Sequence, residues 1–136
     1  MKPRYMLDTN ICIYLMKRQP PQVRARFAEC FVGDVVISAI TLAELEFGVA
    51  CSGDARGMSQ AALDRLLEDI LVAPFEARAA RAYGPVRAAN RERKKGALDK
   101  LIASHALSLG VTLVTNNEAD FRGFAGLVIE NWINNH

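Results

Sequence analysis

The sequence predicts an α/β protein in which a mainly parallel sheet lies between two layers of helices. Short apolar runs alternate along the chain with longer stretches in which apolar residues recur at helical spacing. Nothing between consecutive short runs resembles a β-hairpin turn, so we expect helices to join strands that run parallel. The length of 136 residues suits one ordinary domain, and no linker or repeat divides it. We therefore expect a single three-layer domain with five strands over residues 1–136.

Each expected strand is a short apolar run bounded by polar or turn-forming residues. The β-branched run Val35–Ser38 follows Gly33-Asp34 and has the composition of a buried parallel strand. The expected strands are Tyr5–Leu7, Val35–Ser38, Leu71–Pro74, Val111–Val114 and Leu127–Ile129.

Helical periodicity and helix-end signals define the segments between these strands. Proline suits a first helical turn, as at Pro21, and Gly110 is a favourable helix stop. The polar stretch Ser52–Gly57 is expected to separate two helices. The expected helices are Ile11–Arg18, Pro20–Phe27, Thr41–Val49, Ala62–Ile70, Glu76–Lys95 with a bend near Gly84-Pro85, and Leu98–Leu109.

The composition is that of a soluble globular protein. Hydrophobic residues make up 51% of the chain and charged residues 24%, and the net charge of +2 neither requires nor excludes a nucleic-acid partner. Cys12, Cys30 and Cys51 are odd in number and lack C-x-x-C spacing, which argues against a disulfide framework or a zinc site. No signal segment is evident, and Glu44 and Glu46 interrupt the longest apolar region, so we expect a cytoplasmic protein with no membrane span.

Four carboxylates attract attention, although each has an ordinary structural explanation. Asp8 follows the first expected strand, where aspartate is a favoured N-cap. Glu44 lies three residues after Thr41, which fits a capping box. Asp99 lies in the first turn of a helix, where the helix dipole favours negative charge, and Asp120 lies in a short turn or helix start. Taken singly, these residues are better explained as helix caps than as ligands.

Considered together, the four acids favour a metal site. The carboxyl ends of parallel strands and the starts of the following helices meet at one edge of a sheet, where ligands bind. Asp8, Glu44 and Asp120 follow strands directly or within a few residues, whereas Asp99 reaches this edge only if the preceding helix turns back. Converging carboxylates repel one another unless a cation neutralises them, and oxygen ligands without His or Cys select Mg²⁺ or Mn²⁺. The chemistry that follows is phosphodiester hydrolysis by a metal-activated water.

Other phosphate and hydrolase chemistries lack their motifs. The chain has no G-x-x-x-x-G-K-[ST], no G-x-G-x-x-G after the first strand and no G-x-S-x-G. An enzyme that forms a phosphoryl-aspartate would use Asp8 as its nucleophile, but its usual second aspartate is Asn10 here. Metal ligation is therefore the better role for Asp8, and Thr9 or Asn10 can satisfy the helix start beside it.

The sequence resembles PIN-domain ribonucleases, and more closely the VapC-type toxins of bacterial toxin–antitoxin pairs. The matching motifs are M-L-D-T-N, S-A-I-T-L-A-E-L-E-F-G, G-A-L-D-K-L-I-A-S-H-A-L-S-L-G, L-V-T-N-N-E-A-D-F and E-N-W, in this order from Tyr5 to Trp132. The resemblance implies an Mg²⁺-dependent endoribonuclease that cuts structured RNA such as tRNA. It also implies a homodimer that is inhibited by a VapB-type antitoxin, which covers the active site. Any contact of the toxin with DNA would then be indirect, through the antitoxin. The alternative is a PIN-like module that binds RNA or a partner without catalysis, although such a module should have lost Asp8 or Asp99.

The resemblance also implies roles for individual residues. Asp8 and Asp99 match the main Mg²⁺ ligands, and Glu44 belongs to the same acidic cluster. Asp120 matches a further acidic position, whereas Asn117 stands where many PIN domains carry an aspartate. The polar residues expected to support the site are Thr9, Asn10, Thr115, Asn116 and Asn117.

A group of basic residues precedes and follows Asp99. Cations near a helix end are favourable in themselves, but their clustering favours a rim that binds RNA phosphates. The members of this expected rim are Arg87, Arg91, Arg93, Lys94, Lys95 and Lys100. His105, Phe121 and Trp132 are expected to pack in the core rather than to act on the substrate.

Overall fold

The computed structural model describes residues 2–94 and 96–133 and confirms the expected α/β class. In chain order its elements are β1 (Tyr5–Leu7), α1 (Thr9–Lys17), α2 (Pro21–Ala28), β2 (Val35–Ser38), α3 (Ala39–Ala50), the short 3₁₀ helix η1 (Gly53–Ala55), α4 (Arg56–Asp69), β3 (Leu71–Ala73), α5 (Ala77–Ala89), α6 (Ala97–Leu109), β4 (Thr112–Val114), α7 (Glu118–Phe121) and β5 (Ile129–Glu130). None of the helices in the described parts of the chain combines the length and apolar character needed to cross a membrane.

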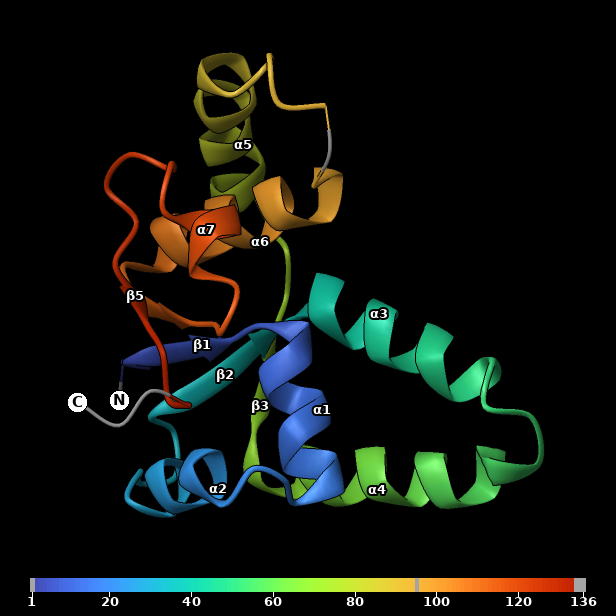
Figure 1. The fold of residues 1–136 in the computed structure, drawn as a ribbon. Coiled ribbons are helices and arrows are strands. Elements are labelled where there is room, and N and C mark those ends of the chain that lie inside the picture. Colours follow the sequence, from blue (N-terminus) through green and yellow to red (C-terminus); the bar gives the residue numbers. More distant parts are fainter. Residues whose placement is uncertain (1, 95, 134–136) are drawn as a thin grey trace.

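The five strands form one sheet in the order β3-β2-β1-β4-β5, and every pair of neighbours is parallel. The chain moves outward from β1 to β2 and β3, and then crosses back to place β4 on the other side of β1 (Figure 1). The strand order therefore reverses between β1 and β4. In open parallel sheets, this switch point is where a ligand crevice forms beyond the carboxyl ends of the strands.

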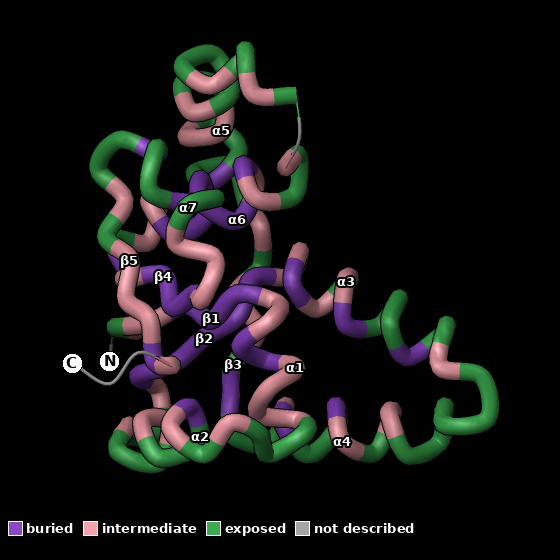
Figure 2. Tube along the Cα trace, in the orientation of Figure 1, coloured by how far each residue is buried: buried purple, intermediate pink, exposed green. Residues whose placement is uncertain are grey.

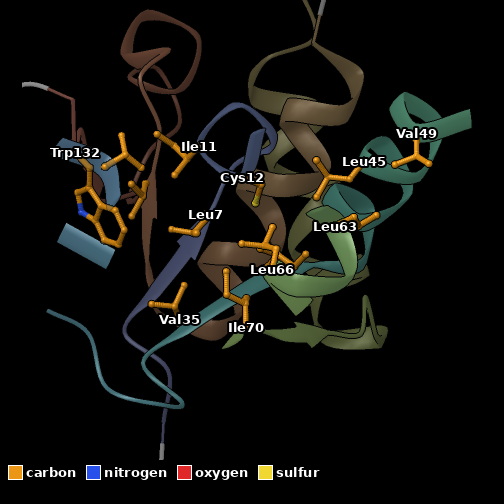
Figure 3. Packing of buried hydrophobic residues seen from close by; sticks show 13 residues of the cluster. Leu7, Ile11, Cys12, Val35, Leu45, Val49, Leu63, Leu66, Ile70 and Trp132 are labelled. Atoms are coloured by element: carbon orange, nitrogen blue, oxygen red, sulfur yellow. The ribbon is translucent and has the colours of Figure 1, made fainter. Parts of the chain in front are cut away.

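Side chains that alternate along the strands build a core on each face of the sheet. Leu7 points to the face covered by α1, α2 and α4, where it joins the cluster drawn in Figure 3 with Ile11, Leu63 and Trp132. Met6 points to the opposite face, where Ile102 of α6 covers the sheet. Figure 2 shows the same division, with buried residues concentrated in the central strands and in α6. Burying two faces explains why these strands are apolar runs rather than alternating ones.

Helices α3 and α4 extend away from the sheet and converge only where η1 connects them (Figure 1). Their inner sides carry buried residues such as Leu45 and Leu63, whereas Phe47 and Met58 are exposed on the projecting arms. Between these two helices and α1 lies a pocket of about 240 Å³. Glu44 contributes to its lining, so this pocket reaches the candidate acidic site.

Several of the expected boundaries are wrong. Helix α4 begins at Arg56 rather than at Ala62, so part of the expected polar break is helical. Helix α3 begins at Ala39 because the Ser38 hydroxyl accepts a hydrogen bond from the Ile40 amide, so Thr41 is not the cap that the Thr41–Glu44 spacing suggested. Helix α5 ends at Ala89 rather than near Lys95, which lies outside the described residues. The last strand is shifted from 127–129 to Ile129–Glu130, where it meets the carboxyl half of β4.

Candidate active site

Asp8 is placed by the end of β1 and the start of α1. Its backbone amide donates to the Val114 carbonyl at 3.0 Å, which continues the pairing of β1 with β4. Its Oδ1 accepts from the Ile11 amide at 3.0 Å and caps α1, so the expectation that Thr9 or Asn10 would cap this helix is wrong. The carboxylate is only 4% exposed, and the Thr115 hydroxyl at the end of β4 donates to it. Asp8 is therefore both a helix cap and a buried acid at the switch point of the sheet.

Glu44 approaches Asp8 from α3. The Thr9 hydroxyl donates to Glu44 Oε1 at 2.7 Å, so the residue next to Asp8 directly fixes the Glu44 carboxylate. Because Thr9 opens α1 and Glu44 lies in the middle of α3, this bond also joins the two helices at the site. Asn10 is half-buried, and its side chain makes no hydrogen bond within the part of the chain that the structure describes.

Asp99 lies in the first turn of α6, as expected, and Gly96 shapes its surroundings. Gly96 starts the helix with φ +81°, a conformation that favours glycine. A Cβ atom at this position would lie 3.1 Å from Asp99 Oδ2. Glycine is therefore needed here both for the backbone turn and for the space that the Asp99 carboxylate occupies.

The turn after β4 supplies the remaining polar residues. The Thr115 hydroxyl accepts from the Asn117 amide at 2.9 Å, and the Asn116 side-chain amide donates to the Tyr14 hydroxyl at 3.0 Å. Asp120, in α7, is exposed and makes an ion pair with Arg93 (Asp120 Oδ1 to Arg93 Nη2, 3.7 Å). Asp120 thus differs from the other acids of the site because a cation already stands beside it.

The acids of the site raise one another's pKa values. Burial raises the pKa of Asp8 from 3.8 to about 6, and the negative charges of Asp99 and Glu44 add to this effect, while the hydrogen bonds from Thr115 and Ile11 oppose it. The pKa of Asp99 is also raised, first by burial and then by Asp120, with Glu44 contributing and Arg93 opposing. Among residues 2–94 and 96–133, no salt bridge involves Asp8, Glu44 or Asp99. Negative charge therefore accumulates here without a fixed counter-ion.

The described residues contain no group of three or more His, Cys, Asp and Glu side chains arranged closely enough to hold a metal ion. Asp8, Glu44 and Asp99 are near enough to repel one another, but they do not converge on one point. Their chemistry nevertheless fits a hard divalent cation, since all donors are carboxylate oxygens and the buried Asp8 has no ion pair with any residue that the structure describes. These three carboxylates are the residues that could hold such an ion.

The expected basic rim is only partly exposed. Arg87, Arg91 and Lys94 are exposed, and Arg87 also lies over the Tyr83 ring on α5, while Lys95 lies outside the described residues. Arg93 lies over the Phe124 ring and donates to the Asp120 carbonyl, and a cavity of about 580 Å³ opens beside it toward Asp99.

Lys100 does not lie on this rim as expected. It is 7% exposed, and its Nζ donates to the Arg93 carbonyl at 2.6 Å. Lys100 follows Asp99 directly on α6, and its side chain turns inward to hold the preceding loop instead of facing solvent.

Sequence reasoning missed three residues that shape the site: Ser38, Gly96 and the Thr9 hydroxyl as the partner of Glu44. Gly96 stood within the G-A-L-D motif, and its place three residues before Asp99 was the available signal. Ser38 ended an apolar run just before a helix, which is a normal N-cap position. The contact between Thr9 and Glu44 joins residues 35 apart in sequence and left no local signal.

The model of the PIN domain family matches residues 5–127, a span that includes the three acids around the switch point of the sheet. A tRNA(fMet)-specific endonuclease VapC of Shigella flexneri is 39% identical over 131 residues, which cover 95% of this chain and 98% of that protein. A chain in the crystal structure of DNA-bound VapBC from Salmonella typhimurium superposes with a TM-score of 0.87 at 36% identity, covering 96% of this chain and 98% of that one.

A third relative extends the same relationship. A chain in the crystal structure of VapBC2 from Rickettsia felis, bound to a DNA fragment from its promoter, has a TM-score of 0.84 at 35% identity and covers 94% of this chain and 98% of that one. The chain therefore belongs to the PIN-domain family and, within it, to the VapC ribonucleases, the toxins of VapBC toxin–antitoxin systems.

Proposed function

We propose that this chain is an Mg²⁺-dependent endoribonuclease in which Asp8, Glu44 and Asp99 hold the ion, with Mn²⁺ as a possible substitute. The observation that carries the proposal is the buried Asp8 carboxylate, which faces two further acids and has no cationic partner among the described residues. A folded protein keeps such unpaired charges together at a cost in stability, and a bound cation removes that cost. The VapC relatives, which are named as ribonucleases, support the assignment of the reaction.

Neighbouring residues hold the proposed metal ligands in place. Asp8 stays fixed because the Ile11 amide and the Thr115 hydroxyl both donate to its carboxylate. Thr9 holds Glu44 in the same way. When bound, a divalent ion supplies an activated water and stabilises the charge on the phosphoryl oxygens. His105 is buried away from solvent, so it is not proposed as a base.

The substrate is proposed to be a structured RNA such as a tRNA. A relative with this specificity in its name, the tRNA(fMet)-specific endonuclease of Shigella flexneri, aligns with 95% of the chain. Arg91 and Lys94 lie exposed near the cavity that contains Asp99, where they can contact the RNA backbone on either side of the cleaved bond. Asp120 and Arg93, which already form an ion pair, are placed at the rim rather than among the main ligands.

The partners are proposed to be a second copy of the chain and a VapB-type antitoxin. The solved relatives are VapBC complexes, some of them bound to DNA, so contact with DNA is proposed to be indirect, through the antitoxin. The pocket between α1, α3 and α4 is lined by Glu44 and by apolar residues such as Ile13 and Val49. An antitoxin segment in this pocket would lie directly beside the acidic site.

RNA cleavage with Asp8→Asn and Asp99→Asn tests the proposed reaction. Purified wild-type protein is expected to cut tRNA with Mg²⁺ and to stop when a chelator is added. Both variants are expected to lose about 100-fold or more of this activity, since each loses a charge that holds the ion.

Asp64→Asn is the matched control, because Asp64 is an exposed aspartate of α4 whose carboxylate accepts a hydrogen bond from Gln60 on its own helix. It should cleave like the wild type. Wild-type activity in both Asp8→Asn and Asp99→Asn, or cleavage that is indifferent to the chelator, would contradict the proposed mechanism.

A further inference from the structure

A buried pair of polar side chains, Ser38 and His105, connects the two helices that carry Glu44 and Asp99. His105 Nδ1 lies 2.8 Å from Ser38 Oγ, and the two residues are 1% and 0% exposed. Ser38 ends β2 and caps α3, whereas His105 lies in the middle of α6. The pair therefore joins α3 to α6 across the carboxyl edge of the sheet.

The hydrogen bonds around the pair form a continuous chain that fixes the state of the imidazole. Ser38 Oγ accepts from the Ile40 amide at 3.1 Å, so the hydroxyl hydrogen is available for His105 Nδ1. The ring also donates a hydrogen bond to the carbonyl of Pro74, which follows β3. Because Ser38 engages Nδ1, the donor of this bond is Nε2–H. The neutral imidazole protonated at Nε2 satisfies all of these groups at once. The ring edge packs on Phe75 at a centroid distance of 5.2 Å, which leaves it little freedom to turn.

The Ser38–His105 pair lies where it can influence the positions of Glu44 and Asp99. Glu44 lies six residues after Ser38 on α3, and Asp99 lies six residues before His105 on α6. Each carboxylate is therefore about 9 Å along a helix axis from the Ser38–His105 contact. Because α3 projects away from the sheet (Figure 1), its orientation depends on the bonds at its base as well as on the packing of Leu45 and Val49. A tilt of about 5° at that base would move Glu44 by about 0.8 Å.

Packing alone does not explain a polar pair in this position. Burying a hydroxyl and an imidazole is costly unless their bonds are kept, whereas two apolar residues would fill the same space. Directional hydrogen bonds, unlike apolar contacts, specify one relative placement of two elements. We propose that Ser38 and His105 are positioning residues of the nuclease, which set the distance between Glu44 and Asp99 so that both can hold the ion. This inference rests on the proposed metal-dependent function.

Variants that keep one half of the His105 contacts separate positioning from stability. In His105→Asn the side-chain oxygen takes the place of Nδ1 and keeps the bond to Ser38, while in His105→Gln the amide reaches Pro74 instead. His105→Leu keeps neither bond. Ser104→Ala is the control, because Ser104 is a fully buried serine of α6 whose hydroxyl donates to the Lys100 carbonyl of its own helix.

The experiment measures Mn²⁺ affinity by calorimetry, kcat and KM for tRNA cleavage, and unfolding by urea. His105→Leu and His105→Gln are expected to lose about tenfold in Mn²⁺ affinity and in kcat with little change in KM, whereas His105→Asn retains most of both. Ser104→Ala should lose stability without losing either quantity. Nitrogen NMR of the wild type should show His105 protonated at Nε2 alone.

Two results would overturn the positioning role. One is wild-type Mn²⁺ affinity and kcat in folded His105→Leu, and the other is an equal loss in His105→Asn and His105→Gln. Both differ from a failure of the proposed function, in which the wild-type protein itself would neither bind Mn²⁺ nor cleave RNA.

Discussion

Asp8 combines the role of a helix cap with its proposed role as a metal ligand. As the N-cap of α1 it stabilises the fold, but its ionised form is buried beside Asp99 and Glu44. Capping of α1 depends on an oxygen acceptor, whereas repulsion from Asp99 and Glu44 depends on the negative charge. An asparagine keeps the acceptor and removes the charge, so a single substitution separates the two.

Asp8→Asn is therefore expected to stabilise the metal-free protein. Since the folded pKa of about 6 lies above the ordinary 3.8, ionisation of Asp8 opposes folding, and the contribution of this group is fully favourable only below about pH 3.8. It is lost as the pH rises through about 6. The difference between these two pKa values corresponds to up to about 3 kcal/mol in the free energy of unfolding. Urea unfolding without metal should show the variant above the wild type near pH 7.5 and equal to it near pH 4.

Asp64→Asn serves as the reference for this measurement, because Asp64 is exposed. Its difference in stability from the wild type should stay small at every pH. A gap between Asp8→Asn and the wild type that does not change between pH 4 and about pH 7.5 would contradict the raised pKa.

Gly96 offers a second prediction for a single residue. Alanine at this position must adopt φ +81°, which costs about 1–2 kcal/mol, and its Cβ would press on Asp99 Oδ2. Gly96→Ala should therefore lower both the free energy of unfolding and kcat, the latter beyond what the unfolded fraction explains. Gly57→Ala in α4 is the control, since a Cβ there meets nothing within 4 Å and stability should rise by up to about 1 kcal/mol. Equal kcat values for Gly96→Ala and the wild type would exclude pressure on Asp99.

At the level of helices and strands, local sequence predicted the elements better than their ends. The strands were found within about two residues, because a short buried run has few ways to be accommodated. Helix α5 ended early, since the charged residues 91–94 that follow it have no apolar spacing that would pack them against the sheet. The burial of Lys100 could not be read from sequence, because it depends on where the Arg93 carbonyl lies after the loop folds.

The loop between α5 and α6 carries the prediction at this scale. If Arg91 and Lys94 contact RNA phosphates, the Arg91→Ala/Lys94→Ala double variant should bind RNA more weakly at every salt concentration tested. The slope of log K against log salt should fall by about 1.4, at about 0.7 for each lost contact with a single strand. Binding is best measured in an Asp8→Asn background, which is expected to prevent cleavage.

Arg24→Ala/Arg65→Ala is the matched control, since both arginines are exposed on α2 and α4, on the opposite side of the sheet from α5 (Figure 1). The slope of this variant should equal that of the parent. If both double variants change the slope equally, a general effect of net charge would explain the result, and Arg91 and Lys94 would not form an RNA-binding rim.

For the molecule as a whole, the sequence singled out three acids that the structure brings near one another, but it did not predict how they are arranged. Asp8 follows β1 directly, so its place at the sheet edge was predictable. Asp99 reaches that edge only because β4 returns to pair with β1 and α6 packs over the sheet, a long-range outcome of strand order. The Ser38–His105 bond spans 67 residues and was equally invisible, although His105 was correctly expected to be packed in the core.

The final prediction concerns the protein as a toxin in a living cell. Expression of the wild-type chain in bacteria should arrest growth and be accompanied by cleaved tRNA, because the proposed site acts on cellular RNA. Asp8→Asn should accumulate to at least the same level, since removal of the buried charge stabilises the fold, and yet leave growth unchanged. Growth curves, blots of tRNA and protein quantification measure the three quantities together. Arrest by Asp8→Asn at matched protein levels would show that toxicity does not arise from this site.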